Sequence, residues 1–190
     1  MIFGIVLMAC SVFSPVKTEY IKEYMVDAKT FGPHLRKTSF KTLAVSMPTA
    51  GRIYQSKEMV YSVRPHEFNY FAKNRWVEPP MQMLQPLIIQ ALQSTHYYKA
   101  VAPASGPGRY DFLLNTQLVD FYQEFCEGSS VFKLTLRAQI VRVSNGKVLA
   151  SKTFTVVQPA PFPNPYGGVI AANLASEKTL SELSAWALKY

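Results

Sequence analysis

The sequence contains few of the residues that build metal and catalytic centres. Its 190 residues include two cysteines and three histidines, and the histidines are widely spaced. It has no Gly-rich phosphate loop and no Gly-x-Ser-x-Gly, His-Glu-x-x-His or Cys-x-x-Cys motif. Asp120 and Glu124 lie four apart in one predicted strand. That spacing separates them by about 13 Å, too far for a catalytic pair. We therefore expect no metal site, no cofactor and no enzymatic activity.

Charged residues are also scarce, at 17% of the sequence, but they are unbalanced, with a formal net charge of +8. Seven basic residues fall between positions 11 and 52, against three acidic ones. Beside a membrane anchor, each such cation adds about 1 kcal/mol of attraction to anionic headgroups. A basic chain is also typical of nucleic-acid binding. Because the sequence has no RNA-binding sheet motif and no clustered arginine–aromatic stripe, we expect no nucleic-acid partner.

The N-terminal apolar run, residues 2–8, is far shorter than the roughly 20 residues of a membrane-spanning helix. It ends in Leu7-Met8-Ala9-Cys10, the pattern of a bacterial lipoprotein signal in which the cysteine is acylated. We therefore predict a signal peptide at residues 1–9, lipidation at Cys10, and a lipidated N-terminus and linker at residues 10–18. Cys126 then has no partner for an internal disulfide. Since no Lys or Arg precedes the run, the alternatives are a start upstream of Met1 or a buried N-terminal strand.

Residues 19–190 are long enough for one domain with a sizeable core. Three successive strands are predicted at 110–125, 131–143 and 148–157, the last two joined by an Asn-Gly turn. The middle strand alternates apolar residues with polar ones, so one of its faces is core and the other is wet or shared with a partner. Shorter strands are expected at 19–25, 41–47, 59–63, 68–71 and 98–102.

Two helices complete the predicted fold. Apolar residues repeat at helical spacing between residues 83 and 92, and Pro86 lies inside that repeat. Because proline lacks a backbone donor and clashes with the preceding turn, the first helix must start late or kink there. A proline-rich connector at 159–165 leads to a second helix at about 168–188. The prediction is an α+β fold: a twisted, mostly antiparallel sheet with two helices packed on one face.

Three segments of the sequence resemble a known family. Residues 70–80 read Tyr-Phe-Ala-Lys-Asn-Arg-Trp-Val-Glu-Pro-Pro and are followed by Met83-Leu84. Tyr-Asp-Phe at 110–112 leads to Leu-Val-Asp-Phe-Tyr-Gln at 118–123, and the terminal helix runs from Ala-Ala-Asn at 171–173 to Ala-Trp-Ala-Leu at 185–188. Together with the lipoprotein signal, these segments resemble the ABC-type transport auxiliary lipoproteins, the partners of MCE-domain lipid transport systems.

The resemblance implies a non-enzymatic envelope protein that contributes to envelope integrity. It would be lipid-anchored in the outer membrane, face the periplasm, and act as adaptor between that membrane and the MCE-domain protein of an ABC lipid transporter. Ser11 follows the cysteine where an inner-membrane retention signal would often have Asp, which favours outer-membrane sorting. The alternative is an envelope lipoprotein that itself binds lipid or glycan cargo.

Four residues are candidates for partner binding: Trp76, Pro79, Phe121 and Tyr122. Trp76 precedes the first helix, where a tryptophan is more often core than interface. Phe121 and Tyr122 point to opposite faces of one strand, so both cannot lie in the same core, and one of them is a candidate contact. We expect the domain to self-associate or to bind an MCE partner.

Overall fold

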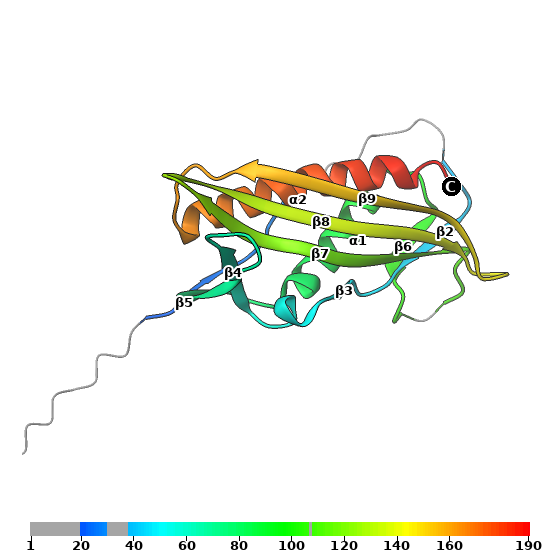
Figure 1. Ribbon diagram of the computed structural model, residues 1–190. Helices are drawn as coiled ribbons and strands as arrows, with labels where there is room; N and C mark the ends of the chain where they lie inside the picture. The colour runs from blue at the N-terminus through cyan, green and yellow to red at the C-terminus, as the bar shows by residue number, and fades with distance from the viewer. Residues whose placement is uncertain (1–19, 30–37, 107) are drawn as a thin grey trace, which may run out of the picture.

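The computed structural model describes residues 20–29, 38–106 and 108–190 (Figure 1). The predicted signal peptide at 1–9, the lipidation site Cys10 and the linker at 10–18 lie outside the described residues. Within them, the chain forms nine strands, two α-helices and a short 3-10 helix. The α+β class predicted from the sequence is confirmed, with both helices on one face of the sheet (Figure 1).

The largest part of the sheet consists of three long antiparallel strands: β7 (Phe112–Cys126), β8 (Ser129–Arg142) and β9 (Lys147–Pro159). They correspond to the three predicted strands. The predicted Asn-Gly turn joins β8 to β9 through residues 143–146, but only Gly146 has a positive φ, of 67°. The turn has more residues than the expected two-residue hairpin, and the Asn145 side chain accepts a hydrogen bond from the Lys147 amide at 3.1 Å.

The other edge of β7 is occupied by three short parallel strands in succession. β2 (Thr42–Val45) pairs with the start of β7, β3 (Thr49–Ala50) with its middle and β4 (Glu58–Ser62) with its end. β6 (Ala100–Pro103) adds outside β2, while β5 (Asn69–Trp76) and β1 (Lys22–Tyr24) add outside β4. The sheet is therefore mixed, although its three antiparallel pairings hold most of the paired residues.

Helix α1 (Pro80–Gln93) and helix α2 (Pro165–Ala187) pack against each other and against the sheet. Of the two alternatives expected at Pro86, a late start or a kink, the late start of α1 is wrong, since the helix begins at Pro80 and continues through Pro86. The missing bond at Pro86 would have gone to the carbonyl of Gln82, and both residues are exposed, so water can reach that carbonyl. Helix α2 begins three residues earlier than expected, where the Asn164 side chain accepts the Gly167 amide at 2.8 Å.

The core fills the layer between the sheet and the helices. Trp76 packs on Phe121 with ring centroids 5.5 Å apart, and Phe121 packs on Phe132 at 4.9 Å. The predicted alternation of β8 is confirmed, because its core face is buried while Arg137 and Gln139 are exposed on the other face. The buried residues of that core face are Phe132, Leu134, Leu136, Ala138 and Ile140.

Candidate functional site

The domain is elongated along the three long strands and has two distinct ends (Figure 1). We call the first the entry end, because β1, where the described chain begins, lies there. It comprises the β4–β5 turn (63–68), the β7–β8 turn (127–128) and the loop 160–164 before α2. The far end comprises the β8–β9 turn (143–146), the segment 108–111 and Lys41, joined by a bond from the Val143 amide to the Asp111 carbonyl at 2.9 Å.

The far end holds an open pocket of about 700 Å³. Its lining combines apolar surface from Phe112 and Val143 with the charged groups of four residues from three separate segments of the chain. Lys41 precedes β2, Arg109 and Asp111 precede β7, and Arg142 ends β8. A pocket with this lining suits a ligand that has both an apolar part and an anionic group.

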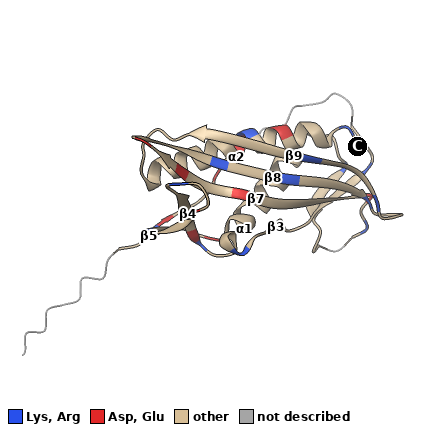
Figure 2. Ribbon diagram, in the orientation of Figure 1, with Lys and Arg blue, Asp and Glu red and all other residues tan. Residues whose placement is uncertain are grey.

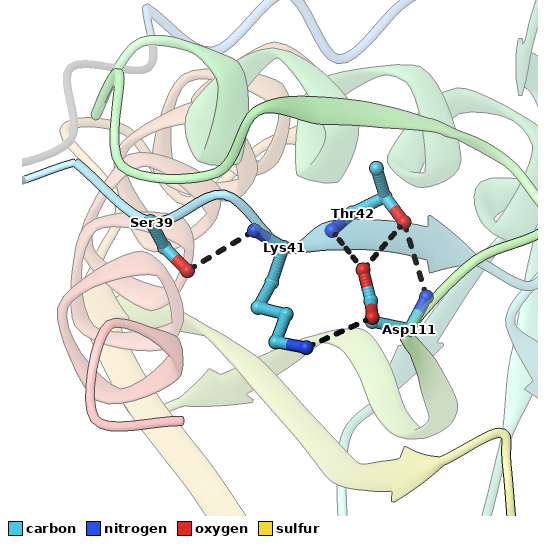
Figure 3. A network of polar contacts seen from close by, with 4 residues as sticks. All are labelled: Ser39, Lys41, Thr42 and Asp111. Atoms are coloured by element: carbon cyan, nitrogen blue, oxygen red, sulfur yellow. Dashed lines mark hydrogen bonds and ion pairs between the residues drawn. The ribbon is translucent and has the colours of Figure 1, made fainter.

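Asp111 is the centre of a polar network in this pocket (Figure 3). Its carboxylate accepts hydrogen bonds from the Thr42 amide at 2.9 Å, the Thr42 hydroxyl at 3.1 Å and the Lys41 ammonium at 3.2 Å. In return, the Asp111 amide donates to the Thr42 hydroxyl at 3.0 Å. The Thr42 amide is the main reason that the pKa of Asp111 lies below its ordinary 3.8. The network joins β2 to the start of β7 and keeps the carboxylate ionised.

Asp111 offsets only part of the positive charge around the pocket. Within the described part of the chain, Arg109 and Arg142 form no ion pair. Lys147 adds a further cation directly opposite Arg142 on β9. Basic ribbon segments are seen at this end in Figure 2. The far end can therefore bind an anionic group without first breaking an internal ion pair of either arginine.

The entry end differs from the far end because it carries a group of aromatic side chains. Tyr61 stacks on Phe71 with centroids 4.4 Å apart, and Phe125 meets both rings edge-on. Besides these half-buried rings, the entry end carries five aromatic side chains with exposed fractions between 45% and 82%. They are Tyr20, Phe68, Tyr70, Phe162 and Tyr166. Exposed aromatic surface of this extent is typical of a contact with a protein or a membrane.

Charged side chains at the entry end are largely paired with one another. Arg64 bonds Glu67 within the β4–β5 turn, and Arg75 on β5 bonds Glu23 on β1 at 2.9 Å. Lys133 bonds Glu124 at 2.7 Å, and this contact is the main reason that the pKa of Lys133 is raised. The two ends therefore differ in chemistry, since one is aromatic with paired charges and the other carries unpaired arginines.

The four residues predicted to bind a partner lie towards the entry end, but they differ in exposure. Trp76 and Phe121 are each only 1% exposed, so a partner cannot touch either side chain directly in this packing. Phe121 is the one of the two neighbouring aromatics that belongs to the core. Tyr122 is half-buried on the opposite face, between Phe68 at 5.1 Å and the Lys133 ammonium at 5.8 Å. Pro79 is half-buried as the residue before α1.

Two further kinds of site are absent from the described residues. No group of three or more His, Cys, Asp or Glu side chains there is placed to hold a metal ion. None of the helices formed by these residues has the length and apolarity needed to cross a membrane.

Residues 28–184 match the family of ABC-type transport auxiliary lipoprotein components. The chain belongs to this family. The membership confirms the resemblance seen in the sequence and identifies a lipoprotein of the cell envelope that assists ABC transport, in a family that is not one of enzymes. No curated protein matches the chain.

The auxiliary lipoprotein shares its fold with several solved structures. A Xanthomonas campestris protein superposes with a TM-score of 0.80 at 23% identity, over 88% of this chain and 95% of that one. An uncharacterised protein gives 0.68 at 15% identity, over 89% and 99%. A hypothetical protein from Chlamydia trachomatis gives 0.52 at 8% identity, over 80% and 98%. At these identities the likeness establishes the fold alone.

Proposed function

We propose that this auxiliary lipoprotein is a non-enzymatic adaptor, anchored in the outer membrane, for an ABC-type intermembrane lipid transport system with an MCE-domain protein. The observation that carries the proposal is the family match over residues 28–184, preceded by the lipoprotein pattern at Cys10. Ser11, in place of the Asp that often retains a lipoprotein in the inner membrane, supports outer-membrane sorting. The domain then faces the periplasm.

The two-ended architecture supports an adaptor. A chain anchored at Cys10 enters the domain beside β1, at the entry end, so the far end is free to point into the periplasm (Figure 1). There Arg109 and Arg142 present cations that an acidic segment of an incoming partner can bind bidentately. The space between sheet and helices is filled by large side chains, among them Trp76, Phe121 and Phe154. That packing favours a docking role over storage of cargo between the layers.

A pull-down of the anchored protein from envelope extracts tests this function. We expect the MCE-domain protein and its ABC transporter to be recovered, and the Arg142→Glu variant to recover less of both. Reversing one contact charge weakens electrostatic association. Lys178→Glu, which makes the same charge change on the exposed surface of α2, is the control and should bind like the wild type. Recovery of the protein without any MCE component would contradict the proposal.

The far-end pocket favours one alternative, a lipoprotein that binds lipid or glycan cargo itself. Its volume of about 700 Å³ is within the range of small-molecule sites. Mass spectrometry of lipids and glycans extracted from the purified anchored protein separates the two functions. Cargo that co-purifies with the wild type and is lost from the Arg109→Ala/Arg142→Ala double variant would support the alternative. A stable MCE complex that contains no such cargo would support the adaptor.

A further inference from the structure

We propose that the aromatic entry end lies on the membrane interface, so that the anchored domain stands on its bilayer in one orientation with the far end directed away. The ligand is thus a lipid surface, and the side chains that contact it are those of the exposed aromatics at this end. The inference rests on the proposed lipid anchor at Cys10 and adds to it a second, non-covalent membrane contact.

The first observation is the distribution of exposed aromatic residues. Six aromatic side chains in the described chain are exposed, and Phe40 is the one of them that lies at the far end. The others surround the entry end on both sides of the sheet. Tyr166 lies on the helix side, where its ring is 6.1 Å from that of Tyr24. Phe68 lies on the opposite side, against Tyr122. Five of the six exposed aromatics of the described chain therefore lie around one end of the domain.

The second observation is where the anchor segment joins the domain. Residues 10–19 connect the proposed lipidated cysteine to Tyr20, the first described residue, beside β1 at the entry end. Ten residues reach at most about 36 Å when fully extended. The entry end is therefore kept near the bilayer, and its local concentration at the membrane is high without any further binding energy. The aromatic surface and the anchor thus coincide at the same end.

The chemistry of the entry end suits the headgroup region. Tyrosine places an apolar ring in the boundary of the bilayer while its hydroxyl stays in the polar layer, and aromatic belts of membrane proteins use this property. In the ion pairs Arg64–Glu67 and Arg75–Glu23, a carboxylate balances the charge of each arginine, so neither pair brings a net charge to that layer. Arg109 and Arg142, which form no ion pair in the described chain, lie at the far end, so attraction of that end to anionic headgroups would orient the domain the opposite way. The two possible orientations are therefore clearly distinguishable.

A fluorescent label at either end tests the orientation in the full-length lipidated protein. The sequence has two cysteines, and Cys126 is the one that is not the proposed acylation site. Because its thiol is free and exposed at the entry end, it can be labelled directly with an environment-sensitive dye. The matched far-end label is placed by Asn145→Cys in a Cys126→Ser background. Each protein is reconstituted into vesicles of phosphatidylethanolamine and phosphatidylglycerol that contain brominated acyl chains. We expect a blue shift and quenching of the dye at residue 126 and neither at residue 145.

Substitutions at the contact give the second readout. The Phe162→Ser/Tyr166→Ser variant, at two exposed positions, should lose most of the blue shift at residue 126 while its melting temperature changes little. Phe40→Ser, the same kind of change at the far end, is the control and should keep the shift. Equal quenching at both ends, or none at either, would overturn the proposal. So would a signal at residue 126 that appears only with added MCE partner or at high protein density, because the end would then be a protein interface.

Flotation of the vesicles separates this proposal from the proposed function. A wild-type protein that does not float with vesicles has no lipid anchor, and both proposals then fail together. A protein that floats but shows no contact at residue 126 keeps its anchor and its adaptor role. In that case the inference about the entry end alone is wrong.

Discussion

At the residue scale, the segments that resemble the family are used mainly to hold the domain together. Asp111 joins β2 to β7, and Trp76 fills the core behind β5. Asn173 on α2 accepts the Asp27 amide at 2.7 Å, which secures the segment after β1. The sequence motifs of this domain thus mark positions where a single side chain connects distant segments, and a motif need not mark a binding surface.

Truncation of the Trp76 side chain should destabilise the fold more than any other single truncation. It is 1% exposed and packs on Phe121. Trp76→Ala should therefore lower the free energy of unfolding by about 3–5 kcal/mol, because it leaves a large cavity in the core. Urea denaturation measures the change. Tyr70→Ala, which truncates an aromatic that is 45% exposed, is the control and should cost far less. An unchanged midpoint for Trp76→Ala combined with lost partner binding would instead identify an interface residue.

Asp111 should make part of the stability dependent on pH. Its pKa in the folded state lies below the ordinary 3.8 because the Thr42 amide and Lys41 bond its carboxylate. The contribution is therefore fully present above the unfolded-state pKa and is lost as the pH falls through the lower folded-state pKa. Asp111→Asn should lower the urea midpoint at neutral pH, and its difference from wild type should shrink below about pH 4. A difference that is equally large at pH 7 and at pH 3 would contradict this explanation.

At the element scale, the sequence predicted what local patterns determine and missed what depends on distant pairing. The meander β7–β8–β9 was predictable from alternation and from the Asn-Gly pair, since hairpin strands are neighbours in the chain. The parallel placement of β2, β3 and β4 along β7 was not predicted. Thr49 pairs with Gln117 and Tyr61 with Gln123, and no local pattern specifies such a register. The two-residue β3 is also too short to give a periodic signal.

Pro86 was expected to disturb α1, yet the helix passes through it. The cost of about 3 kcal/mol for an interior proline is partly offset because proline also restricts the unfolded chain. Pro86→Ala restores the donor to the exposed Gln82 carbonyl, and we expect a gain of about 1–2 kcal/mol in thermal or urea unfolding. Gln90→Ala, at another exposed position of α1, should change stability by less than about 0.5 kcal/mol. A destabilised Pro86→Ala protein would mean that the ring packs usefully against its surroundings.

At the scale of the whole molecule, neighbours in sequence are separated and distant segments are brought together. The basic residues between positions 11 and 52 suggested one cationic face beside the anchor. In the structure, Lys22 on β1 lies at the entry end, whereas Lys41 lies at the far end with Arg109 and Arg142. The far-end pocket could not be predicted, because its cations come from three segments that only the completed sheet joins. The aromatic entry end escaped prediction for the same reason, since its exposed rings come from the residue before β1, from the β4–β5 turn and β5, and from the loop and first turn of α2.

The attachment of the whole molecule to its membrane gives the last prediction. In the part of the chain that the structure describes, no helix could cross a bilayer. Under the proposed function, the acyl chains on Cys10 supply most of the membrane binding. Cys10→Ser should move the protein from the membrane fraction to the soluble periplasmic fraction. Cys126→Ser, the matched change at the other cysteine, should leave it on the membrane. The aromatic entry end and the net charge of +8 should give Cys10→Ser at most a weak residual attachment, whose electrostatic part is screened by salt. A Cys10→Ser protein that stays with membranes after a high-salt wash would show that the anchor is not a lipid on this cysteine.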